Sequence, residues 1–271
     1  MIEGLRVRCN VGPVEVLRLP FLQLVYRRRA VVTRAELRIP DPEGAVRAAL
    51  AVNQPVRVRF GYRGEELWHE WQGTIENVDQ PRYGEDDADA VTVRAVGLEK
   101  ALATTLVTES FYKESARAVA ARLLARTGLP VAGVDIPDAE LPHQVFSRVP
   151  VARALKQLET SLTRAFGADF SHHAVWLGAD GLRWSAGDEP GALYMVETAC
   201  NLVSHTPPLA DGGMGVVESV LLPGLRDGMQ VRIRDTRRDV SLTTRALEVI
   251  HTVRRNGNIT EIRYGKEQGW G

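Results

Sequence analysis

The chain has 271 residues and a mass of 29.9 kDa, enough for one large domain or two smaller ones that each bury a core. Hydrophobic residues make up 44% and charged residues 25%, which excludes a largely disordered protein. The 34 basic and 34 acidic residues cancel, which argues against a protein whose whole surface binds polyanions. No apolar run reaches the roughly 18 residues of a membrane span. Residues 1–5 lack the basic and apolar parts of a signal peptide, so we expect a chain without a membrane span that is made, and kept or assembled, in the cytosol.

The charge is banded along the chain, although its total is zero. Residues 1–60 and 223–271 are net basic, whereas residues 61–100 and 171–222 are net acidic. Solvated faces produce such bands, and complementary patches between neighbouring copies would do so too. The two cysteines, Cys9 and Cys200, form no disulfide framework or CxxC motif, and we expect two buried thiols.

Residues 1–100 have the apolar–polar alternation of β structure, punctuated by glycine and proline turns. Gly73 is expected to mark a bulge or bend, and an acidic loop at residues 85–89 precedes the last strand. The pattern predicts strands at Leu5–Cys9, Val14–Leu17, Val31–Ile39, Val56–Phe60, Leu67–Val78 and Val91–Val96, with a short helix at Ala45–Val52.

The period then changes to that of helices. Apolar residues at helical spacing predict one helix from Ser115 to Gly128 and a second from Pro150 to Gly167. We expect the leucines of these stripes to be buried, namely Leu123, Leu124, Leu155, Leu158 and Leu162. We expect the arginines on the opposite faces of the helices to be more exposed to solvent, namely Arg117, Arg122, Arg126 and Arg153.

The final third returns to strands. A hairpin is predicted around Asp180-Gly181, and turn signals at residues 206–208 and 211–213 bound a long exposed loop. Three strands follow at Met229–Arg234, Arg245–Thr252 and Ile259–Tyr264, with Asn256-Gly257 as the turn between the last two.

This last block resembles the first one. Val56-Arg57-Val58-Arg59 matches Val231-Arg232-Ile233-Arg234, and two further strands follow each motif in the same order, each block closing near a glycine. Any two antiparallel blocks share alternation, but the order and the arginine positions favour an internal duplication. The sequence therefore predicts a mainly β (α+β) fold with two similar small β-barrel domains and a short two-helix insert. Residues 1–107 form the first barrel, 108–170 the insert and 171–271 the second barrel.

Motifs for catalysis or metal binding are scarce. The six histidines, His69, His143, His172, His173, His205 and His251, form no metal-ligand spacing, and a GxSxG elbow is missing. Gly212-Gly213-Met214-Gly215 lacks the ending of a phosphate loop. The acidic pairs Glu65-Glu66 and Asp188-Glu189 lie beside turns, where solvated charge is expected. We therefore predict a structural protein with no enzyme activity and with no catalytic residue, metal site or cofactor.

Two other functions stay open at this point. A soluble tandem-barrel module could recognise a peptide or glycan through Trp68, Trp71 and Trp184. An enzyme could use Asp169, His172 or His173 at a barrel junction. The remaining tryptophans, Trp176 and Trp270, lie in a strand pattern and at the end of the sequence.

The order of the parts resembles the baseplate hub proteins of contractile phage tails, the late-control D family, which is related to the hub part of type VI secretion spike proteins. The similar passages cover most of the chain and end in a run from Leu225 to Gly265. The others are Pro55–Tyr62, Trp71–Val78, Val91–Ala95, Ser115–Ala120 with Thr127–Leu129, and Val151–Leu155 with Phe166–Phe170. This chain is shorter than most members and lacks a needle or lysozyme domain.

The resemblance implies a trimeric ring in which three chains supply six similar barrels, so that a sixfold tail tube meets a threefold spike. It implies as partners the tail tube protein, a separate spike protein, the tape-measure protein and baseplate wedge proteins. DNA would pass through the ring without sequence-specific binding. The location implied is the baseplate of a virion or phage-like injection particle, assembled in the host cytoplasm.

Overall fold

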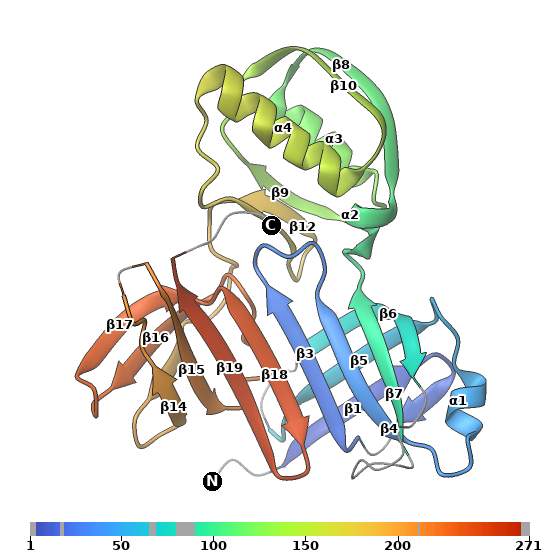
Figure 1. Ribbon diagram of the computed structural model, residues 1–271, viewed down its shortest axis with the longest axis vertical. Helices are drawn as coiled ribbons and strands as arrows, with labels where there is room; N and C mark the ends of the chain where they lie inside the picture. The colour runs from blue at the N-terminus through green and yellow to red at the C-terminus, as the bar shows by residue number, and fades with distance from the viewer. Residues whose placement is uncertain (1–3, 17–18, 65–68, 80–89, 211, 267–271) are drawn as a thin grey trace. The chain divides into compact units, whose positions relative to one another are not determined.

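The computed structural model describes residues 4–16, 19–64, 69–79, 90–210 and 212–266 (Figure 1). The chain forms two compact units. Unit 1 comprises Met1–Arg27, Val32–Leu98 and Pro190–Lys266, and unit 2 comprises Arg28–Val31, Glu99–Glu189 and Glu267–Gly271. Strands dominate, so the predicted mainly β class is confirmed. The helices of the described residues all fall short of the length and apolarity that crossing a bilayer requires.

Unit 1 has two halves, one from each end of the chain. The first half, β1 to β7, consists of β1 (Leu5–Val11), β2 (Val14–Val16), β3 (Phe21–Arg27), β4 (Arg34–Pro40), α1 (Ala45–Ala49), β5 (Pro55–Tyr62), β6 (His69–Asp79) and β7 (Ala90–Gly97). The second half, β13 to β19, consists of β13 (Tyr194–Glu197), β14 (Leu202–Thr206), β15 (Met214–Val220), β16 (Gln230–Asp235), β17 (Val240–Arg245), β18 (Glu248–Arg254) and β19 (Gly257–Gly265).

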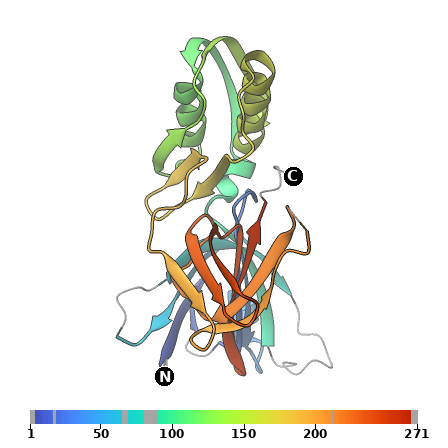
Figure 2. The same ribbon diagram turned by 90° about the vertical axis from the view of Figure 1, so that its left-hand side faces the viewer.

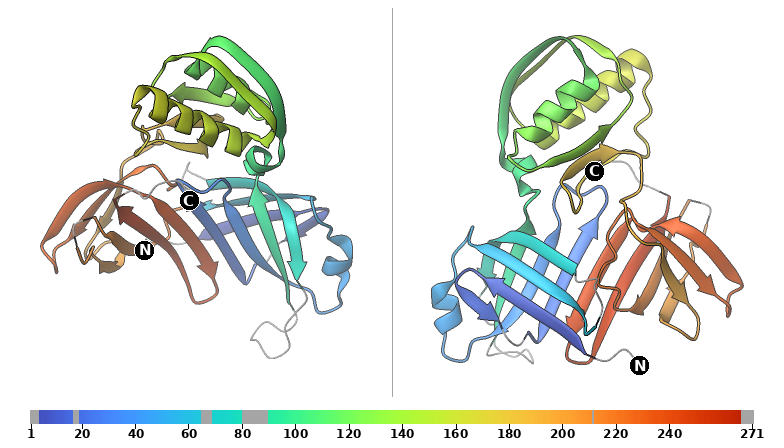
Figure 3. Two further views of the ribbon diagram at one scale, coloured as in Figure 1. Left: turned by 45° about the horizontal axis from the view of Figure 1, so that its top comes forward. Right: turned by 180° about the vertical axis from the view of Figure 1, so that it is seen from behind.

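One sheet of eleven strands runs through both halves in the order β14-β15-β19-β18-β3-β4-β7-β6-β5-β1-β2. A second sheet, β13-β16-β17, belongs to the second half. The large sheet is strongly twisted, so β1, β5 and β6 cross the direction of β3 at a steep angle (Figure 3, right). Within the described residues none of the sheets closes on itself, and the two expected barrels are open sheets that share one core.

The two halves repeat the same strand order. In the first half the order is β3-β4-β7-β6-β5, and β6 pairs with β5 through residues 69–74 and with β7 through residues 73–79. The second half divides these two pairings between consecutive strands: β17 pairs with β16, and β18 pairs with β19. β19 then pairs with β15, and β15 pairs with β14. The blocks that begin at Val56 and Val231 thus share a strand order in which β17 and β18 take the place of β6, and the internal duplication stays a prediction.

The interruption between β17 and β18 lies where β6 is irregular. The pairing of β6 with β7 shifts its register between Ile75 and Asn77, so the expected bend lies just after Gly73. In the second half the chain leaves the strand at Ala246 and Leu247, and Ala246 and Ile75 are both fully buried. In the first half the irregularity only bends β6, whereas at the equivalent place in the second half the strand is divided into β17 and β18.

The halves join where β3 pairs antiparallel with β18, from Phe21 opposite Arg254 to Arg27 opposite Glu248. These two strands lie side by side in the middle of the large sheet (Figure 1). The buried side chains on this side of both halves form one hydrophobic cluster. Tyr62 Oη donates a hydrogen bond of 3.0 Å to the carbonyl of Leu221, and so ties the first half to the second.

Unit 2 contains α2 (Lys100–Thr104), β8 (Leu106–Ser115), α3 (Ala116–Ala125), β9 (Val131–Asp135), β10 (Glu140–Pro150), α4 (Val151–Phe166), β11 (Ala174–Leu177) and β12 (Leu182–Ser185). The β8–β10 ribbon curves around α3 and α4 (Figure 1). Ser115 caps α3 by accepting a hydrogen bond of 3.2 Å from the amide of Ala118, and Gly167 ends α4 in the left-handed conformation at φ 68°. Both helices are thus confirmed, as is the hairpin of β11 and β12.

The side chains of α3 and α4 face as the sequence predicts. The five leucines are buried in the core of unit 2, and the four arginines are exposed. Strands β8, β9 and β10 were not predicted. The β11–β12 hairpin belongs to unit 2, where β12 pairs with β9. The division into two hub domains at residues 107 and 170 stays a prediction.

Candidate functional site

The outward side of the large sheet carries a continuous band of charge across both halves. Side chains of each strand point in turn to the core and to this surface, as the strand registers require. The strands that contribute are β14, β15, β19, β18, β3, β4, β7 and the end of β6. We call this surface the paired-charge face. Its charged residues are Arg27, Arg34, Arg38, Arg94, Arg254 and Arg263, and Glu36, Glu76, Asp79, Glu218, Glu248 and Glu261.

Ion pairs link the strands at the junction of the two halves. Arg27 on β3 lies directly opposite Glu248 on β18, with 2.7 Å between Nε and Oε1. Glu248 also lies 3.4 Å from Arg263 on β19, which in turn contacts Glu261 at 2.8 Å. The hydrogen bond that Arg263 donates to Glu261 and the charges of Glu248 and Glu261 raise the pKa of Arg263. One carboxylate thus bridges arginines from both halves, although such exposed pairs add little stability.

The first half continues the same pattern. Arg94 on β7 reaches Glu36 on β4 at 3.5 Å and Asp79 on β6 at 3.0 Å. Arg34 on β4 contacts Glu76, at the bulge of β6, at 3.0 Å. These pairs neutralise the charges of Arg27, Arg34, Arg94 and Arg263, so this part of the face presents alternating charge. A surface of this kind offers a passing polyanion no row of cations to bind.

A buried aromatic cluster of Tyr26, Phe60, His69 and His251 lies on the core side of the large sheet, where β3 pairs with β18. The His69 and His251 rings are 5.5 Å apart between centroids, and Tyr26 Oη hydrogen-bonds to His69 Nε2. His251 hydrogen-bonds to Thr260 Oγ1 at 3.0 Å and to the carbonyl of Leu225 at 2.9 Å. Burial lowers the pKa of His251 to about 4 and lowers that of His69 well below its usual value, so both rings are neutral near pH 7.

A second buried network connects the two sheets of the second half. His205 Nδ1 lies 3.0 Å from Asp235 Oδ2, and His205 Nε2 lies 2.7 Å from Tyr264 Oη. Although this order of groups resembles a catalytic relay, burial raises the pKa of Tyr264, which disfavours the phenolate. The network satisfies polar groups that β14, β16 and β19 bury together.

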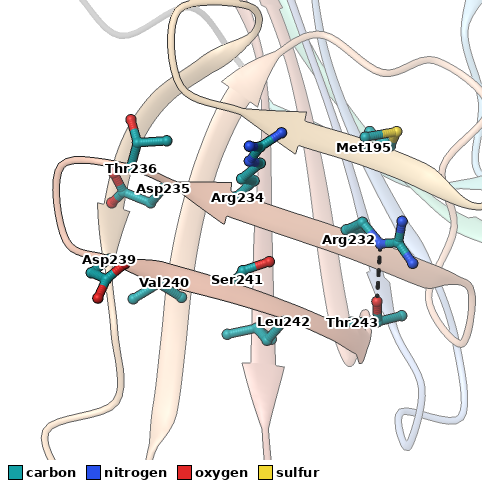
Figure 4. Close-up of a pocket in the computed structure, with 10 residues that line it drawn as sticks. All are labelled: Met195, Arg232, Arg234, Asp235, Thr236, Asp239, Val240, Ser241, Leu242 and Thr243. Carbon is teal, nitrogen blue, oxygen red and sulfur yellow. Dashed lines mark hydrogen bonds between the residues drawn. The ribbon is translucent and has the colours of Figure 1, made fainter.

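Beside it, the outer side of β13-β16-β17 forms a shallow hollow lined by Met195, Arg232, Arg234 and the β16–β17 turn (Figure 4). Arg232 Nε donates to Thr243 Oγ1 at 3.4 Å, and Arg234 pairs with Glu197 at 2.9 Å. The residues that line the hollow do not place a nucleophilic side chain beside a general base. Across the described residues, no group of three or more histidine, cysteine, aspartate or glutamate side chains is placed to hold a metal ion.

The tryptophans named for ligand binding are structural where the structure describes them. Trp71 is 4% exposed and donates to Thr33 Oγ1 at 2.9 Å, and Trp184 is 1% exposed in the core of unit 2. Neither ring can stack on a ligand without unfolding its surroundings. Trp176 is also buried, whereas Trp68 and Trp270 lie outside the described residues.

The acidic and histidine candidates for catalysis are engaged locally. Asp169 accepts hydrogen bonds from the amide and the hydroxyl of Ser171, which lower its pKa. His173 packs against Phe170, with 4.9 Å between ring centroids, and burial lowers its pKa. The prediction of solvated charge at Asp188-Glu189 was wrong for Glu189, which is buried and accepts a hydrogen bond from Trp176 Nε1.

Other sequence candidates fall in turns or outside the description. Gly213 to Gly215 lead into β15 and precede no helix. Cys9 is buried, and burial raises its pKa to about 12, but the prediction for Cys200 was wrong because it lies exposed in the turn between β13 and β14. Glu65, Glu66 and the acidic loop at residues 85–89 lie outside the described residues. The paired-charge face was not predicted as a unit, since its pairs join residues up to 221 positions apart.

No model of a protein family matches the sequence, and no curated protein is detectably similar to it. Solved structures do match. A tail protein from Neisseria meningitidis MC58 is similar over 98% of this chain and 97% of its own, with a TM-score of 0.70 and 12% identity. The prophage MuSo2 43 kDa tail protein from Shewanella oneidensis matches over 98% of both chains, with a TM-score of 0.70 and 11% identity.

A third match is an E. coli component of the type VI secretion system, described as similar to bacteriophage T4 tail proteins. It covers 99% of this chain and 80% of its own, with a TM-score of 0.64 and 9% identity. At these identities the likeness concerns the fold. The chain has the fold of phage tail proteins, as the resemblance in its sequence predicts.

Proposed function

We propose that this chain is a structural hub protein in the tail baseplate of a phage or phage-like injection particle. In this proposal three copies form a ring of six similar halves, and the ring joins a sixfold tail tube to a threefold spike. The paired-charge face lines the channel through which DNA passes. The observation that carries the proposal is the repeated strand order of the two halves, joined within one chain by β3 and β18.

The repeat indicates how copies would join. In strand order β14 is the equivalent of β3, and the end of β6 is the equivalent of β18. Within the chain, β3 pairs with β18; the equivalent contact between copies would therefore pair β14 of one copy with the end of β6 of the next. Both edges are open in the described part of the chain, because β14 pairs only with β15 and residues 76–79 of β6 pair only with β7.

Such a contact is head-to-tail, because two different edges of the chain meet. Head-to-tail contacts generate rings when the rotation closes. Two halves per chain and three chains give six equivalent positions, which matches a sixfold tube. The paired-charge face would then continue around the ring, and its compensated charge suits a channel that must not retain DNA.

The remaining partners follow from the same role. A spike would be a separate chain, and tape-measure and baseplate wedge proteins would contact the assembled ring. The protein would act in the virion after assembly in the host cytoplasm, and it would catalyse no reaction.

The test is the oligomeric state of the purified chain by native mass spectrometry. The expected mass is three times 29.9 kDa. Val203 is 51% exposed on the β14 edge, so Val203→Asp should place a charge in the contact and release monomers. Val52 is 55% exposed outside strands and on neither edge, so Val52→Asp should leave the trimer intact. A monomeric parent chain, or a trimer that survives Val203→Asp, would contradict the proposed contact.

A further inference from the structure

The outer side of the β13-β16-β17 sheet is hollowed where β16 carries two exposed arginines. Arg232 and Arg234, together with Met195 of β13, border a hollow of about 600 Å³, which we call the β16 hollow. The strand registers place Met195 on one side of Arg232 and Thr243 of β17 on the other. Ligand pockets typically have volumes of about 300–1,000 Å³, so the β16 hollow is large enough to receive several side chains of a partner.

The first half has a similar row of arginines, but a carboxylate lies among them. There β5 takes the place of β16 in the strand order, and Glu70 of β6 lies opposite Arg59. Glu70 contacts Arg57 at 2.7 Å and Arg59 at 3.2 Å. In the second half Ser241 of β17 lies opposite Arg234. A serine is shorter than a glutamate and carries no charge, so it neither fills the space beside the arginines nor neutralises them.

The two arginines of the β16 hollow differ in how they are engaged. Arg234 pairs with Glu197 of β13 at 2.9 Å. Arg232 donates a long hydrogen bond of 3.4 Å from Nε to Thr243 Oγ1, which uses one of the five N–H donors of its guanidinium group. Arg232 is therefore the cation that can take an added carboxylate, in the paired geometry that arginine favours.

The opposite end of the β16 hollow is acidic. Figure 4 shows Arg232 and Met195 at one end and Asp239 at the other. Val240 lies opposite Asp235, which puts the exposed Asp239 level with the residue after Asp235, four positions along β16 from Arg232. At the rise of a strand these four positions span about 13 Å. The hollow therefore offers a cation and an anion about 13 Å apart.

We propose that the β16 hollow binds an extended segment of a partner protein in which an acidic and a basic side chain lie four residues apart. Side chains four residues apart in an extended segment point to the same side, so the carboxylate would meet Arg232 and the cation would meet Asp239. The hydroxyls of Ser241 and Thr243 would hydrogen-bond to the segment between them. A polyanion such as DNA fits poorly, because Asp239 repels it. The site lies within one chain, so the inference does not depend on ring formation.

The probe is a dye-labelled peptide with a glutamate and a lysine four residues apart in an otherwise uncharged sequence. Its binding to the full chain is measured by fluorescence anisotropy, and we expect saturable binding that weakens as salt is raised. Two matched peptides carry two glutamates or two lysines at the same positions. Each should bind at least about fivefold more weakly, because one of its charges meets a like charge in the hollow.

Four single variants locate the site. Arg232→Gln should weaken binding about three- to tenfold, because it removes charge-assisted hydrogen bonds. Asp239→Asn should weaken binding of the glutamate–lysine peptide and strengthen that of the two-glutamate peptide. Ser241→Glu places a carboxylate beside the arginines, as Glu70 does in the first half, and should abolish binding. Val52→Glu adds the same charge at an exposed position outside the hollow and should change binding less than about twofold.

The thermal midpoint distinguishes a blocked site from a damaged fold. Ser241→Glu should melt at or above the temperature of the parent, because the new carboxylate lies beside two arginines. Equal binding of the three peptides, or equal binding by Ser241→Glu and Val52→Glu, would overturn the proposal. Preferential binding of a 20-base-pair DNA duplex or of inorganic phosphate at Arg232 would also overturn it. A change in oligomeric mass with Ser241→Glu would overturn it as well, because the hollow would then belong to a contact between copies.

Discussion

Leu158 should be among the most costly single truncations in unit 2. It is fully buried on α4, within a core of twenty buried residues shared with α3, β8, β10 and β12. Leu158→Ala removes three carbons, worth about 0.8 kcal/mol each in transfer free energy, or about 2.4 kcal/mol together. The cavity that remains among Leu155, Leu162 and their neighbours adds to this, so the total should fall between about 2 and 5 kcal/mol.

The assay is urea unfolding of the full chain, with hydrogen exchange followed by fragment analysis to locate the loss within residues 99–189. Arg153→Ala is the matched control, because Arg153 is exposed on the same helix and its loss should change stability by less than about 0.5 kcal/mol. Arg122→Ala removes contacts to Glu114 and Phe111 at the surface and should cost no more than about 1 kcal/mol. Similar small losses for Leu158→Ala and Arg153→Ala would refute the packing of the helices inferred from their apolar stripes.

Two further outcomes concern unit 1. His251 has a folded pKa of about 4 against about 6.5 when unfolded, so its contribution is present above pH 6.5 and is lost as the pH falls toward 4, by up to about 1.4 kcal/mol per pH unit. Urea unfolding between pH 7 and pH 4 measures this, and a flat profile from pH 6.5 to pH 5 would disprove it; His69 shifts in the same direction. Gly73→Ala should cost about 1–3 kcal/mol in thermal unfolding, because an added Cβ would collide with the carbonyl of Val96 and the ring of Trp71. Gly133→Ala meets only ordinary van der Waals contact and should be nearly neutral, so equal effects at the two glycines would count against the crowding at Gly73.

Local patterns predicted the elements whose burial follows one period. The stripes of α3 and α4, the alternation of β5 and β7, and the Asn256-Gly257 turn are all present in the structure. β3 was missed because its outward positions, Phe21, Gln23 and Val25, are mostly apolar and half-buried, so the strand shows no polar alternation. β17 was missed because only Val240 and Leu242 of its six residues are large and apolar, which makes its alternation too short to stand out.

The candidate surfaces depend on contacts that no local pattern records. Arg27 and Glu248 are ordinary surface charges until β3 and β18 bring them together, and Arg232 meets Thr243 only once β16 pairs with β17. The shared strand order was the exception, because a repeated order of strands can be read from the sequence even when its pairing cannot. Cys200 shows the opposite case, where a residue type that is usually buried occupies an exposed turn.

The pairing of β3 with β18 has a consequence for how the chain is made. β3 ends at Arg27 and its partner begins at Glu248, so the ribosome must add more than two hundred residues before the pair can form. Because translation adds about 5–20 residues per second, the second edge of β3 stays unpaired for about 10 to 45 seconds after its synthesis. During that time the nascent chain exposes Leu22, Leu24 and Tyr26 beside an unpaired backbone, a combination that attracts other chains. The segment Glu99–Glu189, which supplies all the helices and strands of unit 2, is complete well before β18 appears, and its contacts are more local. We therefore expect it to fold first, while the first half of unit 1 depends on chaperones until translation is nearly finished.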